Sequence, residues 1–197
     1  MSRVAVLGVP RGGTTLAVGL LRILGYRLPD ADPCCLLGES RRLRWADSPL
    51  HDNIPQLACE IDALPDGVVW KDPTVAMYAA QIDWSEWTVI RVIRDPHSVA
   101  ASEQRWLPDA HTPVELIERA RQWASVLDAV PAALRIGVSV MRARPVHALQ
   151  MLAHATADTH PMEDALERAT AFIRAEGGYH CPRPGACGLR EAAHSIP

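Results

Sequence analysis

The sequence has little lysine, few cysteines and no long apolar run. Only Lys71 among its 20 basic residues is a lysine, and the other 19 are arginines. The five cysteines are odd in number and form no repeated CxxC pattern, so we expect a reduced, cytoplasmic protein rather than a secreted one. No stretch reaches the roughly 20 apolar residues of a membrane helix, and no signal-peptide pattern follows Met1. We therefore expect no membrane association.

Charge and length narrow the class further. The formal net charge of −3 gives no whole-surface case for nucleic-acid binding. The 197 residues, 48% of them hydrophobic, can bury a core without disulfides or a metal. We expect one domain over residues 1–197, with 177–197 as a loop or loose tail. The excess of arginine is typical of GC-rich coding, which leaves open why position 71 is a lysine.

Apolar periodicity predicts alternating strands and helices. This alternation favours an α/β fold, a three-layer sandwich with a central parallel sheet. Ligands of such sheets bind beyond the carboxyl ends of the strands. The strands are predicted at 3–8, 68–70, 87–93 and 135–140, and the helices at 16–24, 54–64, 74–82, 98–106, 114–130, 146–155 and 162–175.

A glycine-rich turn follows the first predicted strand and opens a helix. Gly8 and Gly13 have the spacing of a P-loop, GxxxxGK[ST], whose backbone N–H groups cradle phosphate. The lysine that acts on the β- and γ-phosphates in nucleoside triphosphatases is replaced by Thr14. Arg11 supplies a positive charge earlier in the turn. The turn is either an anion cradle of another kind or a strand–helix connection without a ligand.

Two further turns repeat one pattern at strand ends. KDP follows the strand ending near position 70, and RDP follows the strand 87–93. Asp72 and Asp95, each before a proline, are typical N-caps, which we favour over catalytic roles. Lys71 and Arg94 lie on the ligand side of the sheet and either bind a multiply anionic ligand or are solvated strand-end charges. Ser102 follows Arg94 by eight residues on the next helix.

Together these segments resemble a known signature. VPRGGTTL followed by VIRDPHSVAAS is similar to the nucleotide-binding segments of the sulfotransferases that use 3′-phosphoadenylyl sulfate (PAPS), in their bacterial and tyrosylprotein-like branch. The likeness covers roughly residues 3–24 and 67–106. It implies a P-loop-like turn that binds the 5′-phosphosulfate through Arg11, Gly12, Gly13, Thr14 and Thr15. It also implies a 3′-phosphate site at Arg94 and Ser102.

The resemblance also implies catalytic residues. In similar KDP segments the lysine faces the sulfuryl group, which gives Lys71 a catalytic role beside Arg11. Glu39, in a GES segment similar to a GEE segment with a catalytic glutamate, is the first candidate for the general base that the acceptor hydroxyl needs. The alternatives are His51, Asp72 and His97.

The sequence departs from this family at three places. Arg11 stands where many members have lysine, and Leu16 stands where hormone-type enzymes have a tryptophan that stacks on adenine. The C-terminal RKG segment that closes over the 3′-phosphate in those enzymes is not recognisable.

The expected activity is transfer of a sulfuryl group from PAPS to a hydroxyl or amine acceptor by in-line displacement, with PAP as product and no metal requirement. His180, Cys181 and Cys187 make only a weak zinc pattern. The acceptor is expected to be a small molecule or a peptide, and neither its identity nor the oligomeric state can be read from the sequence. Two alternatives stay open: an inactive PAP-binding protein of the same fold, and a P-loop kinase-like nucleotide-binding protein.

Overall fold

The structure, a computed structural model, describes residues 1–29, 54–105, 111–157 and 163–174. Its centre is a sheet of parallel strands in the order β2-β1-β3-β4. The strands are β1 (Arg3–Leu7), β2 (Val69–Trp70), β3 (Trp87–Ile93) and β4 (Leu134–Gly137). Helices flank the sheet, which confirms the predicted α/β class with a central parallel sheet.

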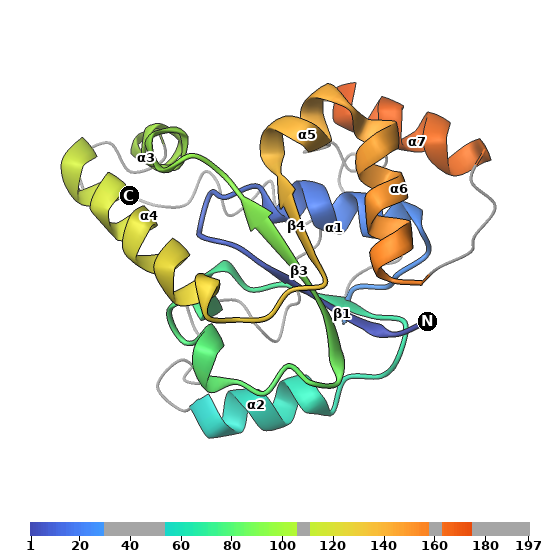
Figure 1. The fold of residues 1–197 in the computed structure, drawn as a ribbon, viewed down its shortest axis with the longest axis horizontal. Coiled ribbons are helices and arrows are strands. Elements are labelled where there is room, and N and C mark those ends of the chain that lie inside the picture. Colours follow the sequence, from blue (N-terminus) through green and yellow to red (C-terminus); the bar gives the residue numbers. More distant parts are fainter. Residues whose placement is uncertain (30–53, 106–110, 158–162, 175–197) are drawn as a thin grey trace, which may run out of the picture.

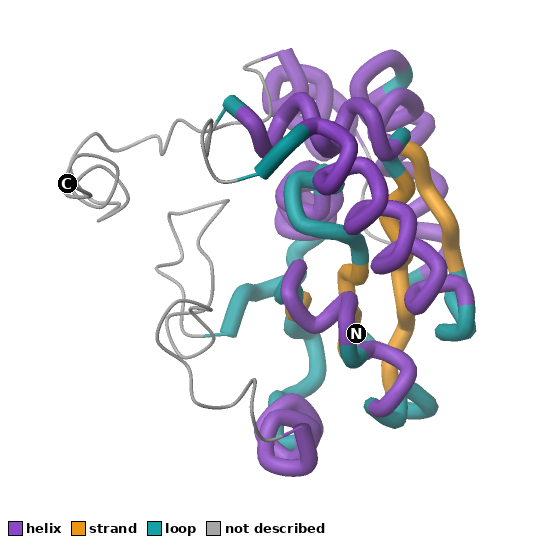
Figure 2. Tube along the Cα trace, turned by 90° about the vertical axis from the view of Figure 1, so that its left-hand side faces the viewer, coloured by secondary structure: helices purple, strands orange, loops and turns teal. Residues whose placement is uncertain are grey.

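Each face of the sheet packs against its own group of helices (Figure 1). One group contains α1 (Thr14–Ile23), α5 (Val138–Ala143), α6 (Pro145–Ala155) and α7 (Glu163–Arg174). The other contains α2 (Ile54–Asp62), α3 (Pro96–Gln104) and α4 (Pro113–Asp128). Figure 2, seen from the side of α3 and α4, shows the strands running behind helices.

Side-chain alternation along β1 explains the two cores. Val4 and Val6 lie in the core under α1, whereas Ala5 and Leu7 lie in the core on the opposite face. All four are almost fully buried, as expected of a strand covered on both faces. On the α1 side the packing is so close that a Cβ on Gly19 would lie 2.1 Å from Cζ of Phe172 in α7.

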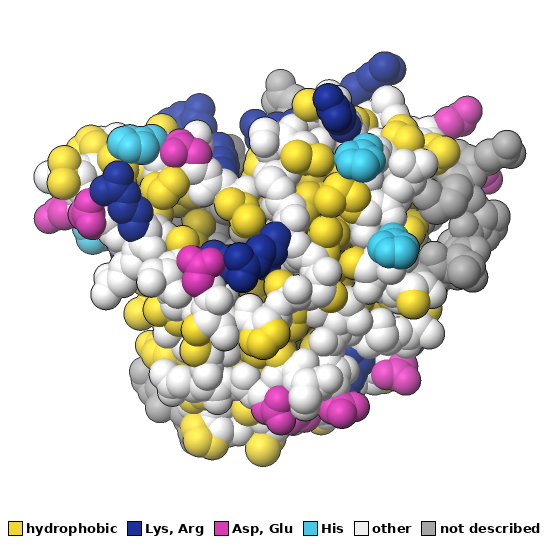
Figure 3. All heavy atoms as spheres, viewed as in Figure 1, with side chains coloured by type: hydrophobic (Ala, Val, Ile, Leu, Met, Phe, Trp, Pro, Cys, Tyr) yellow, Lys and Arg dark blue, Asp and Glu magenta, His cyan; other side chains and the backbone are white. Residues whose placement is uncertain are grey.

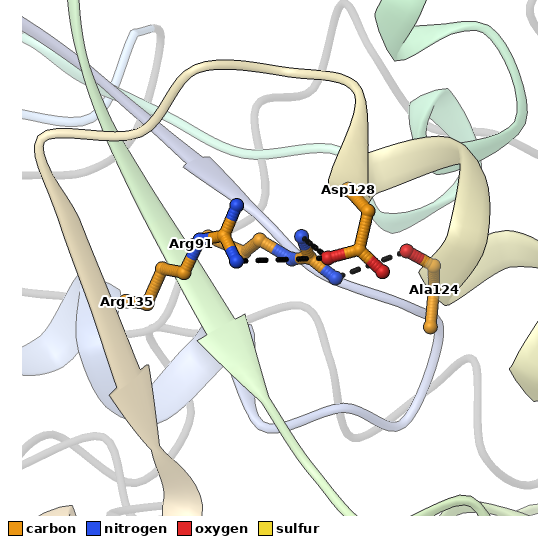
Figure 4. Close-up of polar contacts among 4 residues, drawn as sticks. All are labelled: Arg91, Ala124, Asp128 and Arg135. Atoms are coloured by element: carbon orange, nitrogen blue, oxygen red, sulfur yellow. Dashed lines mark hydrogen bonds and ion pairs between the residues drawn. The ribbon is translucent and has the colours of Figure 1, made fainter.

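The ion pair of Arg91 and Asp128 ties β3 to the C-terminal end of α4 (Figure 4). Nη1 of the buried Arg91 side chain donates a hydrogen bond to Oδ1 of Asp128 at 2.5 Å, and Nη2 donates to the carbonyl oxygen of Ala124 at 3.0 Å. Arg135 of β4 approaches the same carboxylate at 3.7 Å. The hydrogen bond from Arg91 is the largest cause that lowers the pKa of Asp128, and the positive charges of Arg91 and Arg135 lower this pKa further.

One predicted element was wrong in type and another in extent. The helix expected at 74–82 is a pair of 3₁₀ turns, η3 (Pro73–Met77) and η4 (Ala79–Gln81), which are separated by Tyr78 because its backbone leaves helical geometry with φ −121° and ψ 0°. The strand expected at 135–140 ends at Gly137. Gly137 pairs with Ile93, the last residue of β3, so no neighbouring strand continues to pair with residues 138–140, which instead begin α5.

Candidate functional site

The turn between β1 and α1 presents backbone N–H groups at the carboxyl end of the sheet. Gly13, the N-cap of α1, has φ 90°, and Arg11 has φ 59°, so both lie in the left-handed region. The Gly12 N–H donates to the Val9 carbonyl at 2.8 Å, which closes the turn. The first N–H groups of a helix are suited to binding an anion, and this turn places them where ligands of parallel sheets bind.

Lys71 is buried against this turn. It follows β2 directly, and its side chain is only 7% exposed. Its Nζ donates a hydrogen bond to Oγ1 of Thr15, at 2.7 Å, in the first turn of α1. Lys71 is therefore not a solvated strand-end charge. The structure brings its ammonium group to the start of α1, next to the predicted phosphosulfate turn.

Arg94 contacts the same turn from β3. Its Nη1 donates to the carbonyl oxygen of Arg11 at 2.7 Å. Burial is the first cause that lowers the pKa of Arg94, and the nearby charges of Arg142, Arg11 and Arg105 lower it further. Arg94 thus fixes the left-handed residue of the turn and contributes to a region of concentrated positive charge.

Asp95 and Ser102 lie at the two ends of α3. The Asp95 side chain accepts from the Ser98 N–H at 2.8 Å, which confirms the predicted N-cap. This hydrogen bond is the main reason that the pKa of Asp95 lies below its ordinary value. Ser102, more than one turn further on, is only 7% exposed. The cap fixes where α3 starts after β3, and thereby where Ser102 lies relative to Arg94.

Of the four candidates for the general base, the structure describes only Asp72 and His97. Glu39 and His51 lie outside the described residues, so their roles stay predictions. Asp72 is only 3% exposed, and its carbonyl accepts from Val75 at the start of η3. His97 is exposed on the first turn of α3.

Sequence reasoning missed the contribution of α5. A Cβ on Gly13 would lie 2.4 Å from Cγ2 of Val138, so the first residue of α5 packs directly on the turn. Arg142 of the same helix is one of the charges that affect Arg94. The alternating Val138 and Val140 favoured a strand, which concealed the helix. The end of the neighbouring strand at Ile93 is the signal that could have revealed it.

Positive side chains gather at this end of the molecule. In Figure 1, β3 and β4 point toward α3 and α5, and in Figure 3 several Lys or Arg side chains lie along the same upper edge. Within the described ranges, no group of three or more His, Cys, Asp or Glu residues is placed to hold a metal ion. In the same ranges, no helix has the length and apolarity needed to cross a membrane.

A separate hollow of about 590 Å³ lies at the opposite end of the sheet. Its lining includes Trp84 and Trp87 at the amino end of β3 and Pro131 just before β4. It is thus separated from the turn by the length of the strands.

No protein-family model and no curated protein matches the sequence. Among solved structures, the chain is similar to retinol dehydratase in complex with androsterone and inactive cofactor PAP, with a TM-score of 0.52 and 13% identity over 89% of this chain and 65% of that one. Retinol dehydratase in complex with retinol and PAP gives the same values.

A second solved protein shares the fold. The sulfotransferase domain from the Synechococcus PCC 7002 olefin synthase matches with a TM-score of 0.51 and 16% identity, over 84% of this chain and 76% of that one. The chain has a sulfotransferase-like fold. It spans just under two thirds, 65%, of the retinol dehydratase chain.

Proposed function

We propose that the protein is a PAPS-dependent sulfotransferase, which moves a sulfuryl group from PAPS to a hydroxyl or amine of a small-molecule or peptide acceptor. The observation that carries this proposal is the meeting of Lys71 and Arg94 at one turn. Lys71 donates to Thr15 at the start of α1, and Arg94 donates to Arg11 within the turn. Two cations from two strand ends, joined to a turn at the N-terminus of α1, suit a ligand with more than one anionic group. The fold shared with PAP-bound proteins supports the same ligand.

The residues would divide the work as follows. The N–H groups of Gly13, Thr14 and Thr15 bind the 5′-phosphosulfate, while the Gly12 N–H closes the turn on Val9 and Arg11 adds charge. Arg94 and Ser102 bind the 3′-phosphate. The acceptor oxygen or nitrogen attacks sulfur in line, a new bond to sulfur forms, and the bond from sulfur to the bridging oxygen breaks. The electron pair leaves with PAP, and the acceptor proton passes to a general base, for which Glu39 is the first candidate.

In this proposal Lys71 acts on the charge that develops during the reaction. Negative charge grows on the bridging oxygen as the bond to sulfur breaks, and a preorganised cation stabilises it more strongly in the transition state than in the ground state. The ammonium is held at Thr15 before any ligand binds, so little reorganisation is needed. A guanidinium has a different shape and cannot take the same place.

Ligand-induced thermal stabilisation tests the ligand assignment. We expect PAP to raise the melting temperature clearly, adenosine 5′-phosphosulfate to raise it less, and ATP with magnesium to raise it least. The reason is that only PAP carries both a 5′-phosphate and a 3′-phosphate. Stabilisation by ATP with magnesium but not by PAP would contradict the proposal and favour a kinase-like protein.

Turnover tests the enzymatic part separately. The protein is incubated with PAPS and a panel of phenols, alcohols, amines and tyrosine peptides, and PAP release is followed. We expect PAP formation that depends on the acceptor. Tight binding of PAP without turnover across the whole panel would instead identify an inactive PAP-binding protein.

A further inference from the structure

Arginines in the turn, directly after β3, at the C-cap of α3 and in α5 interact electrostatically beyond the carboxyl end of β3. Arg94 is the central one, since it is partly buried and donates to the Arg11 carbonyl. Burial is the largest cause that lowers its pKa, and the positive charges of Arg142, Arg11 and Arg105 follow in that order. The site that we predicted from the sequence contains Arg11 and Arg94, but neither Arg105 nor Arg142.

The position of α5 explains how Arg142 approaches Arg94. Gly137, which precedes α5, pairs with Ile93, so α5 begins at the level where Arg94 leaves β3. Val138 faces the turn, because a Cβ on Gly13 would lie 2.4 Å from its Cγ2. Arg142 follows Val138 by four residues and therefore shares its helix face.

Arg105 is placed by the same logic on α3. Ser102 and Arg105 are three residues apart, at the C-terminal end of α3, and so occupy neighbouring positions on one face. Ser102 is only 7% exposed as a residue, and its hydroxyl forms no hydrogen bond with another residue in the described part of the chain. A hydroxyl without a protein partner is available to donate a hydrogen bond to a bound anion.

The charges in this cluster are poorly compensated by the protein. Within the described ranges, the side chains of Arg105 and Arg142 form no hydrogen bond or ion pair. Asp95 does oppose the cluster, since it raises the pKa of Arg94, but its carboxylate also caps α3. Like charges held together repel one another and destabilise the free protein. An anion bound among them would remove that repulsion.

We propose that Arg142 and Arg105 join Arg94 and Ser102 in binding the 3′-phosphate of PAPS, so that α3 and α5 hold this group from two sides. The inference rests on the proposed function, since it names further residues of the same ligand site. In this arrangement Arg94 has two roles. One of its nitrogens donates to the Arg11 carbonyl, and its guanidinium group binds the phosphate together with those of Arg105 and Arg142.

The test compares Arg142→Gln with the matched control Arg144→Gln. Arg144 is also exposed, lies just past the end of α5 and is not among the charges that affect Arg94. Binding of PAP and of adenosine 5′-phosphosulfate is measured by calorimetry for wild type and both variants. For Arg142→Gln we expect PAP to bind roughly tenfold more weakly, the loss typical of one charge-assisted hydrogen bond, and adenosine 5′-phosphosulfate to change less than about twofold.

A second readout separates ligand contact from damage to the fold. Removing a repelling charge should leave the melting temperature of the free Arg142→Gln protein equal to or above that of wild type, while the stabilisation by PAP shrinks. Arg105→Gln should behave in the same way, and Arg144→Gln should match wild type in every measurement.

The outcomes distinguish the two proposals. If wild type does not bind PAP, the proposed function itself fails. If wild type binds PAP and Arg142→Gln binds it equally well, the function stands and the assignment of Arg142 is overturned. An equal loss for Arg144→Gln would also overturn it, because the effect would then be one of general charge.

Discussion

At the scale of single residues, Lys71 is the candidate catalytic residue that the structure brings next to the predicted phosphosulfate turn. It is the only lysine of the chain, and the structure buries it against Thr15. Lys71→Ala should lower kcat by on the order of 10²–10³, as loss of one oxyanion donor does, while PAP binding changes little. Sulfuryl transfer at saturating PAPS, beside a PAP titration, measures both.

The conservative variant sharpens this prediction. Lys71→Arg keeps the charge but should not restore full kcat, because the planar guanidinium cannot occupy the site of the ammonium. A Lys71→Ala protein with normal kcat would remove Lys71 from the mechanism.

Substitution of Arg94 should have the opposite effect to substitution of Lys71, since it should lower the affinity for PAP. Arg94→Ala removes the proposed contact to the 3′-phosphate and also the hydrogen bond to the Arg11 carbonyl. We expect PAP to bind at least roughly tenfold more weakly, and its advantage over adenosine 5′-phosphosulfate to narrow. Titration of both ligands measures this. Unchanged affinity for both would show that Arg94 is not at the 3′-phosphate.

At the scale of elements, the contact between α5 and the turn depends on Gly13. A Cβ there would meet Val138 at 2.4 Å in a backbone with φ 90°. Gly13→Ala should therefore destabilise the protein by about 1–3 kcal/mol and weaken PAP binding. Gly137→Ala is the control, since its added Cβ would meet nothing closer than Ser139 Oγ at 3.4 Å, and it should change stability by less than about 1 kcal/mol. Chemical denaturation measures both variants, and equal effects would contradict this account of the turn.

The N-cap of α3 gives a prediction about pH. The hydrogen bond from Ser98 lowers the pKa of Asp95 in the folded protein. A lowered pKa means that the ionised carboxylate stabilises the fold above its unfolded pKa of about 4, and that this contribution is lost as pH falls through the folded value. Asp95→Asn keeps a capping side chain without the titration. Its melting temperature should approach that of wild type as pH falls from 6 to 3, and a constant difference would contradict the assignment.

At the scale of the whole molecule, the sequence predicted the sheet better than its connections. Strand 87–93 was predicted with its observed bounds, because a β-branched run between turn residues is a strong signal. The site turn and the strand-end cations followed from the same pattern. The helix 138–143 was missed, because its start depends on where β3 ends, which is information from a distant segment.

Long-range pairs were likewise beyond sequence reasoning. Arg91 lies within the apolar strand β3, and its partner Asp128 is 37 residues away on α4. Nothing near Arg91 in the sequence identifies that carboxylate. The link from Arg94 to the Arg11 carbonyl spans 83 residues and was equally hidden. Local patterns thus predicted which residues lie at the carboxyl edge, and tertiary packing decided which of them touch.

The structure of the complex with PAP is the most direct test of the central claim, that one edge of the sheet binds both phosphate groups of this nucleotide. The account predicts the 5′-phosphate at the N–H groups of Gly13, Thr14 and Thr15 and the 3′-phosphate within hydrogen-bond distance of Arg94 and Ser102. A nucleotide bound elsewhere, such as in the hollow beside Trp87, or bound with its two phosphates exchanged, would contradict it.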